Sequence, residues 1–424
     1  MNSIYRKFIT IILFASGLSY SGQDYRTLDV SEFGIFPQLN VNESSEAKSA
    51  RFEKIDEAFR YAVQHKINLF FPRGIYDVGN HNFPFRTPNS QGAPQTSSLL
   101  DCANITIAGE EGTVFKTSSL YGADVLQLNQ VKNIKFRNIE ITATIRHLNK
   151  SGSNGISITN GFDNITLENI FIHDLPGVDK GNWIDGSKGL TIQSDSGSRA
   201  LHGTLTAHNI KIKDVAYGFR MDTEHISDVM AMYKTINLDL DLYIEKAWQG
   251  VSIEFGKAVK NIDPNSRLLI QIRGVLKNCQ QYVRFARVIG GNYNFNLVRT
   301  QSYDQVMRDK NNKLWIKESD GVFGFLSYYT KKANVVIKGN VGDVDTKIWI
   351  GAVGSIIEPF NLKNRTEQNT FVFDVDGRSK TEDIRIIRWM GESLHNNNIS
   401  MTHKTTHILP IEFRSNNNIF YHLQ

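Results

Sequence analysis

Residues 209–224 read Asn-Ile-Lys-Ile-Lys-Asp-Val-Ala-Tyr-Gly-Phe-Arg-Met-Asp-Thr-Glu and contain two short alternating patterns in a row. The first is Asn209-Ile-Lys-Ile212, in which apolar and polar residues alternate after an asparagine. The second is Gly218-Phe-Arg-Met221, with the same alternation after a glycine. Alternation with a period of two is typical of a β-strand that is buried on one face. The stretch therefore predicts two consecutive strands joined by a short turn.

Both patterns recur along the chain as imperfect repeats. The asparagine-led strands begin at Asn104, Asn133, Asn164, Asn209, Asn237, Asn334 and Asn369, and the glycine-led strands begin at Gly155, Gly189, Gly218 and Gly250. The first three asparagines are 29 and 31 residues apart, a period expected of stacked solenoid coils. Asparagine tolerates left-handed backbone at a corner and can stack in ladders between coils. An antiparallel sandwich would show more Asn-Gly or Asp-Gly hairpin turns. The repeats therefore predict an all-β chain folded as a right-handed parallel β-helix.

One helical pattern precedes the repeats. Within residues 51–63, one helical stripe holds Phe52, Ile55, Phe59, Ala62 and Val63. Residues 68–76 follow as a buried strand that ends in Phe-Pro-x-Gly-x-Tyr. Together with the upstream Phe33-Gly34, this ending resembles the opening of pectate-lyase-like right-handed parallel β-helix proteins, in which the helix caps the open end of the coil. A cap at about 28–80 would cover a first coil that otherwise exposes its core and its strand edge.

The chain begins with the features of an export signal. Arg6 and Lys7 precede an apolar run from Phe8 to Leu18, and small residues follow it. This pattern predicts a signal peptide at 1–21 and a mature chain that starts near Gly22. The run is too short to span a bilayer, and no later apolar stretch suggests a membrane span. We expect a soluble secreted or periplasmic protein whose residues 22–424 form a single β-helix domain, with a loop inserted at about 303–322 where the repeats break.

Net charge and cysteine content limit the classes of binding partner that we expect. The full chain carries a formal charge of +5, and removal of Arg6 and Lys7 with the signal leaves about +3. This mild basicity is compatible with an anionic polysaccharide, although it is equally compatible with no charged partner. Lysines and arginines are dispersed and no nucleic-acid motif is present, so we expect no nucleic-acid partner. The two cysteines, Cys102 and Cys279, have no zinc-type spacing. Export would permit a disulfide between them, but two cysteines so far apart in the sequence are more often buried free thiols, which is what we expect here.

Stacking the glycine-led strands in register places alternate residues on one outward ladder, with coils about 4.8 Å apart. The middle of this ladder collects Gln193, Asp195, Asp222, Glu224 and Glu254, flanked by Arg220 and Arg284, and the coil of Arg284 offers Arg287 as a further candidate. The alternative is an ordinary solvated face, on which charges are common and the Arg220–Asp222 neighbours form a weak surface ion pair. Crowded acids, however, raise a pKa, and a general acid requires that shift. The concentration of acids therefore favours a catalytic cleft on an exposed strand face.

Asp222 and Glu224 are the candidate catalytic residues, because they point to the same side of one strand. Their Cα atoms would be roughly 6.5–7 Å apart, which suits an inverting glycosidase. The candidate substrate-binding residues are Gln193, Arg220, His225, Trp248, Glu254 and Arg284. Gln193 and His225 would position water or sugar, and Arg220 and Arg284 would hold sulfate or carboxylate groups. Trp248 is equally consistent with stacking on a sugar ring and with packing at a corner.

The sequence Asp222-Thr223-Glu224, with Gln193 one coil earlier, resembles the iota-carrageenases. These β-helix hydrolases carry a Glu-x-Asp catalytic pair on one strand and an assisting glutamine one coil before it. The resemblance implies a glycoside hydrolase that acts on an anionic, sulfated polysaccharide and needs no cofactor. The order of the two acids is reversed here, which leaves the acid and the base unassigned. The Asn-Thr-Asp, Asp-Asp, Gly-His-Gly and Arg-Ile-Lys signatures of polygalacturonase-like enzymes are absent.

Two other functions fit the same residues. A polysaccharide lyase acting on a uronate polymer would use an arginine or lysine as base and would hold calcium at the acids. A non-catalytic glycan-binding β-helix would show aromatic platforms along the coil instead of one acidic focus. In each case we expect a monomer with a polysaccharide partner.

Overall fold

The computed structural model describes residues 26–38, 45–78, 84–85, 100–117, 124–143, 154–175, 186–193, 203–222, 235–255, 267–300, 322–344, 348–354, 366–379, 384–390, 394–402 and 419–423. The predicted signal peptide at 1–21 lies outside these residues. So does the predicted loop at 303–322, except for its last residue, Val322, which begins a strand.

The described elements are almost all strands. In chain order they are β1 (Thr27–Asp29), the 3₁₀ helix η1 (Val30–Phe33), α1 (Ser45–His65), β2 (Asn68–Phe71), β3 (Gly74–Asp77), β4 (Pro84–Phe85), β5 (Leu100–Gly109), β6 (Thr113–Thr117), β7 (Leu126–Ala143), β8 (Ile156–His173), β9 (Lys188–Gln193), β10 (Gly203–Asp222), β11 (Thr235–Glu254), β12 (Arg267–Lys277), β13 (Gln281–Ala286), β14 (Asn292–Val298), β15 (Val322–Tyr328), β16 (Asn334–Val344), β17 (Ile348–Gly354), β18 (Thr366–Glu367), β19 (Thr370–Ser379), β20 (Ile384–Met390), β21 (Leu394–His395), β22 (Asn398–Thr402) and β23 (Ile419–Leu423).

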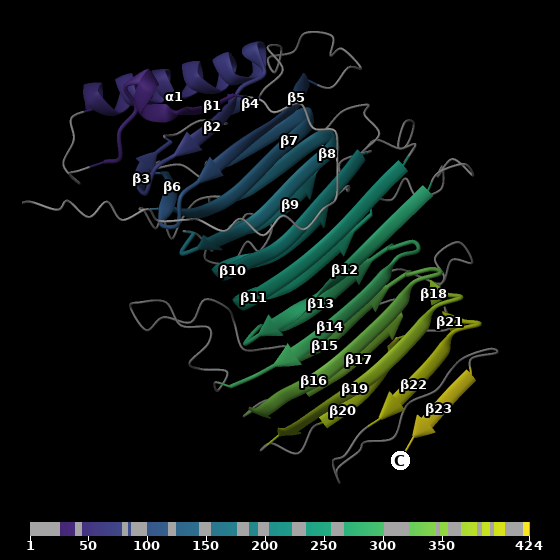
Figure 1. Cartoon of the computed structure of the whole chain (residues 1–424). Coiled ribbons are helices and arrows are strands. Elements are labelled where there is room, and N and C mark those ends of the chain that lie inside the picture. The colour runs from purple at the N-terminus through teal and green to yellow at the C-terminus, as the bar shows by residue number, and fades with distance from the viewer. Residues whose placement is uncertain are drawn as a thin grey trace, which may run out of the picture.

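The strands form a parallel β-helix. Twenty-one of the described strands belong to one continuous sheet, and the pairings between coils are parallel, as between β7 and β8 or between β10 and β11. Figure 1 shows the coils stacked in chain order from the purple N-terminal end to the yellow C-terminal end. This architecture confirms the predicted parallel β-helix, the fold implied by the resemblance to pectate-lyase-like proteins, and excludes the antiparallel sandwich.

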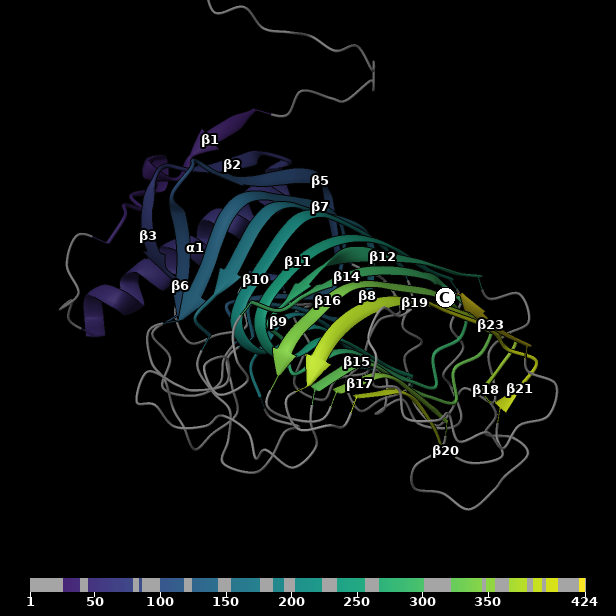
Figure 2. The same cartoon turned by 90° about the horizontal axis from the view of Figure 1, so that it is seen from below.

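A single long strand passes through three faces of the coil, and β11 shows their order. Residues 235–240 lie on a first face, 242–245 on a second face, and 249–254 on a third, which we call the site sheet. Lys246, with φ of 56°, turns the chain between the second face and the site sheet, and Asp214, with φ of 53°, does the same in β10. Figure 2 shows the long strands curving from one face to the next.

The core is a set of apolar columns that run along the coil axis. On the site sheet, Ile192, Met221, Ile253 and Phe285 pair in register from coil to coil, and each is fully buried. Full burial of one such side chain contributes about 1.5–3 kcal/mol. The inward column fixes the direction of the residues between its members, so that Arg220 and Asp222 point away from the core.

Asparagine ladders form at two corners, as the repeats predict. Asn164 Nδ2 donates to Asn133 Oδ1 at 2.9 Å, and both residues have left-handed backbone, with φ of 48° and 58°. A second ladder joins Asn138, Asn169 and Asn209, with hydrogen bonds of 2.9 and 2.8 Å.

The placement of Asn209 with Asn104, Asn133 and Asn164 in one repeat series is wrong. Ile210 pairs with Ile170, so Asn209 belongs to the second ladder. The first face of that coil opens instead at Gly203, where a Cβ would lie 1.1 Å from the Phe162 carbonyl oxygen. The asparagine therefore comes one corner later than in the coils before it.

Glycine opens each strand in the middle of the site sheet for a steric reason. A Cβ on Gly218 would lie 2.5 Å from the carbonyl oxygen of Gly250, and a Cβ on Gly189 would lie 2.7 Å from that of Gly218. Contacts this short require a shift of the backbone, so a larger residue does not fit. The recurring glycines of the sequence are therefore the points where neighbouring coils approach most closely.

Helix α1 lies at the N-terminal end of the stack (Figure 1) and is longer than predicted, since it begins six residues before residue 51. Ile55, Ala58, Phe59 and Ala62 are buried, and the Phe59 ring centroid is 5.9 Å from that of Phe71 in β2. The predicted apolar stripe is confirmed for Ile55, Phe59 and Ala62, which are buried, and for Val63, which is partly buried against the core; the side chain of Phe52 lies outside the described residues. Neither this helix nor η1, the helices of the described residues, is long and apolar enough to cross a membrane.

Cys102 and Cys279 are both buried free thiols, as the sequence predicts. Burial raises the pKa of each thiol to about 12. They serve as small apolar core residues, since they form no disulfide with each other.

Candidate functional site

The outward residues of the site sheet form two rows that follow the coil axis. One, the arginine row, aligns Ser157, Thr191, Arg220, Ser252 and Arg284. The other, the acid row, aligns Thr159, Gln193, Asp222 and Glu254. Each side chain therefore lies one coil, about 4.8 Å, from its neighbours in the row. This register confirms that the glycine-led strands stack as the sequence predicts.

The prediction of an exposed strand face is wrong. Arg220 and Asp222 are each 8% exposed and Glu254 is 9% exposed, while Ser157 and Thr191 are fully buried. Buried charges are tolerated only when opposite charges and hydrogen bonds compensate them. The two acids meet this condition, because each forms an ion pair with at least one arginine of the same sheet.

Asp222 is held by Arg220 of its own strand. The Arg220 guanidinium donates to the Asp222 carboxylate and lies 4.8 Å from the centre of the Tyr217 ring. The Tyr217 ring meets the half-buried Trp248 edge-on at 5.2 Å. Burial raises the pKa of Tyr217 to about 12, so its phenol keeps its proton at neutral pH. Stacking and ion pairing together fix Arg220, and Arg220 in turn fixes one carboxylate oxygen.

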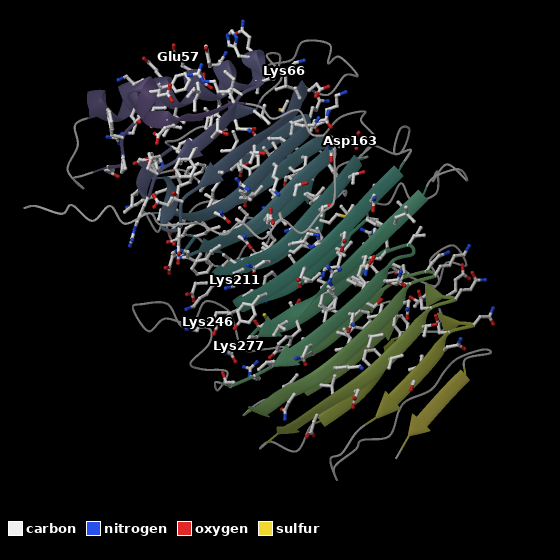
Figure 3. The ribbon with its side chains drawn as sticks, in the orientation of Figure 1. Glu57, Lys66, Asp163, Lys211, Lys246 and Lys277 are labelled. Atoms are coloured by element: carbon white, nitrogen blue, oxygen red, sulfur yellow. The ribbon has the colours of Figure 1, made fainter. Side chains whose placement is uncertain are left out.

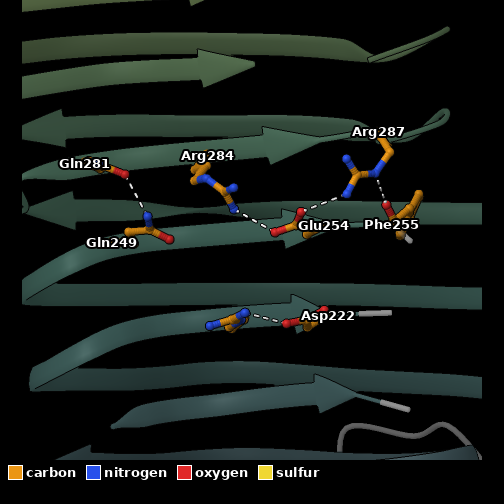
Figure 4. Close-up of polar contacts among 8 residues, drawn as sticks. Asp222, Gln249, Glu254, Phe255, Gln281, Arg284 and Arg287 are labelled. Atoms are coloured by element: carbon orange, nitrogen blue, oxygen red, sulfur yellow. Dashed lines mark hydrogen bonds and ion pairs between the residues drawn. The ribbon is translucent and has the colours of Figure 1, made fainter. Parts of the chain in front are cut away.

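Glu254 is held by two arginines of the next coil (Figure 4). Arg284 Nη1 donates to one carboxylate oxygen at 3.0 Å, and Arg287 Nη2 donates to the other at 3.1 Å. Arg287 also donates from Nε to the Phe255 carbonyl at 2.8 Å, and its φ of 59° turns the backbone at the end of β13. The arginine side chains are 26% and 23% exposed and the Glu254 side chain only 12%, so the cations lie nearer to solvent than the carboxylate.

Three arginines, Arg220, Arg284 and Arg287, accompany the two described carboxylates of the site, Asp222 and Glu254. Among the described residues, no group of three or more histidine, cysteine, aspartate or glutamate side chains is placed to hold a metal ion.

Uncharged polar groups flank the charged centre. Gln249 Nε2 donates to Gln281 Oε1 of the adjacent coil at 2.7 Å (Figure 4). The hydroxyls of Ser157, Thr159 and Thr191 are buried and have no hydrogen-bond partner among the described residues. Buried hydroxyls normally bond to protein, water or ligand, so this end of the two rows has unused capacity for hydrogen bonds.

The structure brings together five of the candidate residues. Gln193, Arg220, Asp222, Glu254 and Arg284 lie on successive coils of one sheet. Trp248 lies at the corner before its strand and packs on Tyr217. Glu224 and His225 lie outside the described residues, as does Asp195.

Two residues of the site were missed by the sequence patterns. Tyr217 and Gln249 immediately precede the glycines that open β10 and β11 on the site sheet, at positions 218 and 250. The sequence marks both residues only by their place directly before a recurring glycine, because the alternating pattern begins at the glycine itself.

No family model matches the sequence, and no curated protein matches it. Among solved structures, the chain is similar to the A-module of a mannuronan C-5 epimerase from Azotobacter vinelandii, with 11% identity, a TM-score of 0.46, and coverage of 95% of this chain and 100% of the other. It is also similar to a GH136 lacto-N-biosidase from Eubacterium ramulus, with 11% identity, a TM-score of 0.39, and coverage of 84% of this chain and 62% of the other. A tailspike protein of the Acinetobacter baumannii bacteriophage Fri1, a capsular polysaccharide depolymerase, gives 10% identity, a TM-score of 0.37, and coverage of 94% and 63%. The chain thus spans less than two thirds of the length of the biosidase and of the tailspike, and likenesses this remote carry no function across.

Proposed function

We propose that this protein is an exported glycoside hydrolase that cleaves an anionic, sulfated polysaccharide on the site sheet. The observation that carries the proposal is the concentration of ion-paired charge on three successive coils. The same two rows hold serine and threonine toward the N-terminal end and Ala286, Leu326 and Ala352 on the other side, and the next charged residue in register with the arginine row is Arg388, three coils after Arg284. Three arginines and two carboxylates concentrated between neutral stretches are the pattern of a site and not of an evenly solvated face.

Arg284 and Arg287 are the proposed anchors for the substrate's charged groups. Both guanidiniums converge on Glu254, and each remains about one-quarter exposed. A guanidinium presents several N–H groups in a planar fork that suits sulfate and carboxylate oxygens. Glu254 is therefore a positioning residue, which holds the two cations where an anionic sugar would meet them.

Asp222 and Glu224 are the proposed catalytic pair. The contact with Arg220 orients the Asp222 carboxylate, so we assign Asp222 as the base that activates water, and Glu224 would then protonate the leaving oxygen. Gln193, next to Asp222 on the preceding coil, and His225 would position the water or the sugar.

The test is a screen of the purified protein against carrageenans, alginate, pectate and glycosaminoglycans, with reducing ends and ultraviolet absorbance read together. We expect reducing ends without a new double bond. Asp222→Asn and Glu224→Gln should each lower the rate at least about 100-fold, the scale of acid–base catalysis. Asp239→Asn is the matched control, since Asp239 pairs with Arg273 at 2.7 Å on the first face. Full activity in both site variants would overturn the assignment.

A lyase acting on a uronate polymer is the second candidate, and the three arginines favour it. Calcium-dependent pectate and alginate lyases of this fold use arginine or lysine as the base and calcium at an acid cluster. Here the described acids already have arginine partners, which compete with a cation. Products that absorb in the ultraviolet through a new double bond, and whose formation a chelator abolishes, would identify the lyase.

The proposal also includes export of the chain, a monomeric state and a capping role for helix α1. The signal at 1–21 would direct the chain out of the cytoplasm, where a polymeric substrate is accessible to a monomer. Helix α1 would act as the cap of the N-terminal coil, since its buried stripe contacts the first strands.

A further inference from the structure

The second face of the coil carries an outward row of its own, one corner away from the site sheet. Glu140 of β7, Phe171 of β8, Lys211 of β10 and Tyr243 of β11 pair in register, and we call them the aromatic row. Their strand neighbours, such as Ile170 and Ile172, are buried, so the row itself points outward. Figure 3 labels Lys211 at this side of the coil.

Phe171 is held in place by a fixed partner. Its ring stacks on His173 with 4.4 Å between centroids and 23° between planes. The histidine is itself locked, because Nε2 lies 2.8 Å from a Glu140 oxygen and Nδ1 lies 3.0 Å from an Asp174 oxygen. A ring that is already ordered loses little freedom when a ligand packs on it.

The surface beside Phe171 is hollowed. A hollow of about 510 Å³ is lined by Glu140, Phe171, Lys211 and the asparagine ladder at 138, 169 and 209. Tyr243 lies two coils beyond Phe171, a separation of about 9.6 Å, which is close to the length of a disaccharide. Two aromatic rings therefore stand at sugar-like spacing, with a lysine between them and amide groups alongside.

We propose that the aromatic row is a second glycan-binding site, which holds a polysaccharide strand along the coil axis. Flat aromatic rings pack against the C–H faces of sugar rings, and the asparagine amides, Lys211 and Glu140 can bond to sugar hydroxyls. Charges here are mixed, since Glu140 contacts His173, and Glu245, beside Tyr243, pairs with Lys277 at 3.1 Å. The row therefore recognises ring faces and hydroxyls, whereas the arginines of the site sheet recognise anionic groups. The inference rests on the proposed function only for the choice of polysaccharide as ligand.

Affinity electrophoresis tests this site without relying on cleavage. Gels would contain iota-carrageenan, alginate, pectate, chondroitin sulfate or neutral agarose, with added salt that screens the arginines of the site sheet. We expect retardation of the wild-type protein in at least one gel, and Phe171→Ala or Tyr243→Ala should weaken it roughly five- to tenfold. Phe171→Tyr keeps an aromatic ring and should keep binding. Leu269→Ala removes an exposed apolar side chain, 57% accessible, from the first face and serves as the matched control.

Two outcomes would overturn the second site. One is an unretarded wild-type protein in every gel. The other is unchanged retardation of the Phe171→Ala/Tyr243→Ala double variant, provided that it melts at the wild-type temperature. The variant Asp222→Asn separates this inference from the proposed function, since it should lose cleavage and keep its retardation. Unimpaired cleavage by both Asp222→Asn and Glu224→Gln would reject the proposed catalytic pair and leave the second site standing.

Discussion

Glu254 shows, at the scale of a single residue, how the site accommodates buried charge. Its carboxylate accepts from the guanidiniums of Arg284 and Arg287, at 3.0 and 3.1 Å, and so offsets the repulsion between these two cations. Glu254→Gln keeps the shape and removes the charge, so both arginines lose their anion. We expect a loss of about 1–3 kcal/mol in the free energy of unfolding, less than for a fully buried pair. Urea titration measures it.

Glu367→Gln is the matched control for that experiment. Glu367 pairs with one cation only, Lys331 at 3.0 Å, and both side chains are more exposed than Glu254. The expected loss is below about 1 kcal/mol, as for ordinary surface pairs. Equal losses in the two variants would contradict the reading of Glu254 as a shared anchor.

The two thiols give a second prediction at the residue scale. Burial raises the pKa of Cys102 and Cys279 from 9.0 to about 12. The native protein should therefore react negligibly with a disulfide reagent at pH 8, and both thiols should appear after denaturation in guanidinium. Because the folded pKa is the higher one, burial of the thiols adds stability below pH 9, and this contribution is lost as the pH rises toward 12. Fast reaction of a native thiol at pH 8 would contradict the burial.

Single residues also mark where sequence reasoning stops. The alternation after Gly218 correctly placed Arg220 and Asp222 on the side away from the core. It could not give their burial, because burial depends on Tyr217 and on strands that are distant in the sequence. The contact of Arg287 with Glu254 depends on a left-handed turn at the strand end, and a period of two carries no information about such a turn.

At the scale of elements, the glycine-led corner of β10 is the most sensitive point of the site sheet. A Cβ on Gly218 would lie 2.5 Å from the Gly250 carbonyl oxygen and 2.5 Å from Ile244 Cγ2, and backbone cannot yield as a flexible side chain does. Gly218→Ala should therefore cost about 1–3 kcal/mol by overpacking. It should also lower any catalytic activity, because it moves Arg220 and Asp222.

Lys211→Ala on the same strand is the control for this substitution. Lys211 is exposed on the second face, so its truncation should change the urea midpoint only slightly. A Gly218→Ala variant as stable as Lys211→Ala would show that the corner can relax, and the steric account of the recurring glycines would fail.

The sequence predicts the elements whose position follows from the local repeat, but not those at which the register of the coil changes. Asn133 and Asn164 follow directly from the repeat and form the predicted ladder. Asn209 has the same local pattern but sits on Asn169, because the coil that contains it begins at Gly203, and nothing in the local pattern records this change of register. The apolar stripe within residues 51–63 predicts helix α1, but its first turns from Ser45 carry no apolar periodicity, so the sequence pattern does not show where the helix begins.

For the whole molecule, the parallel β-helix separates the inward residues, which form the core, from the outward residues, to which we assign the two proposed sites. Apolar columns run along the inside, whereas the residues of both proposed sites lie in outward rows on separate faces. The site sheet and the aromatic row are on different sides of the Asp214 and Lys246 corners, so substitutions in one should leave the other intact. If both proposals hold, one part of a polysaccharide could follow the aromatic row while another part of the same polymer lies on the site sheet.

The same geometry predicts that damage stays local along the axis. Each coil contacts mainly its neighbours, so a cavity should loosen adjacent coils and fade with distance. Phe59→Ala removes a ring that packs on Phe71 at the N-terminal end, and Phe371→Ala removes one that packs on Phe325 near the other end. Each should cost about 3–5 kcal/mol locally. Hydrogen exchange should show lost protection in β2 and β5 for the first variant and in β16, β19 and β22 for the second, with β10 and β11 unchanged in both. Uniform loss of protection along the whole coil in either variant would show global cooperativity and contradict coil-by-coil coupling.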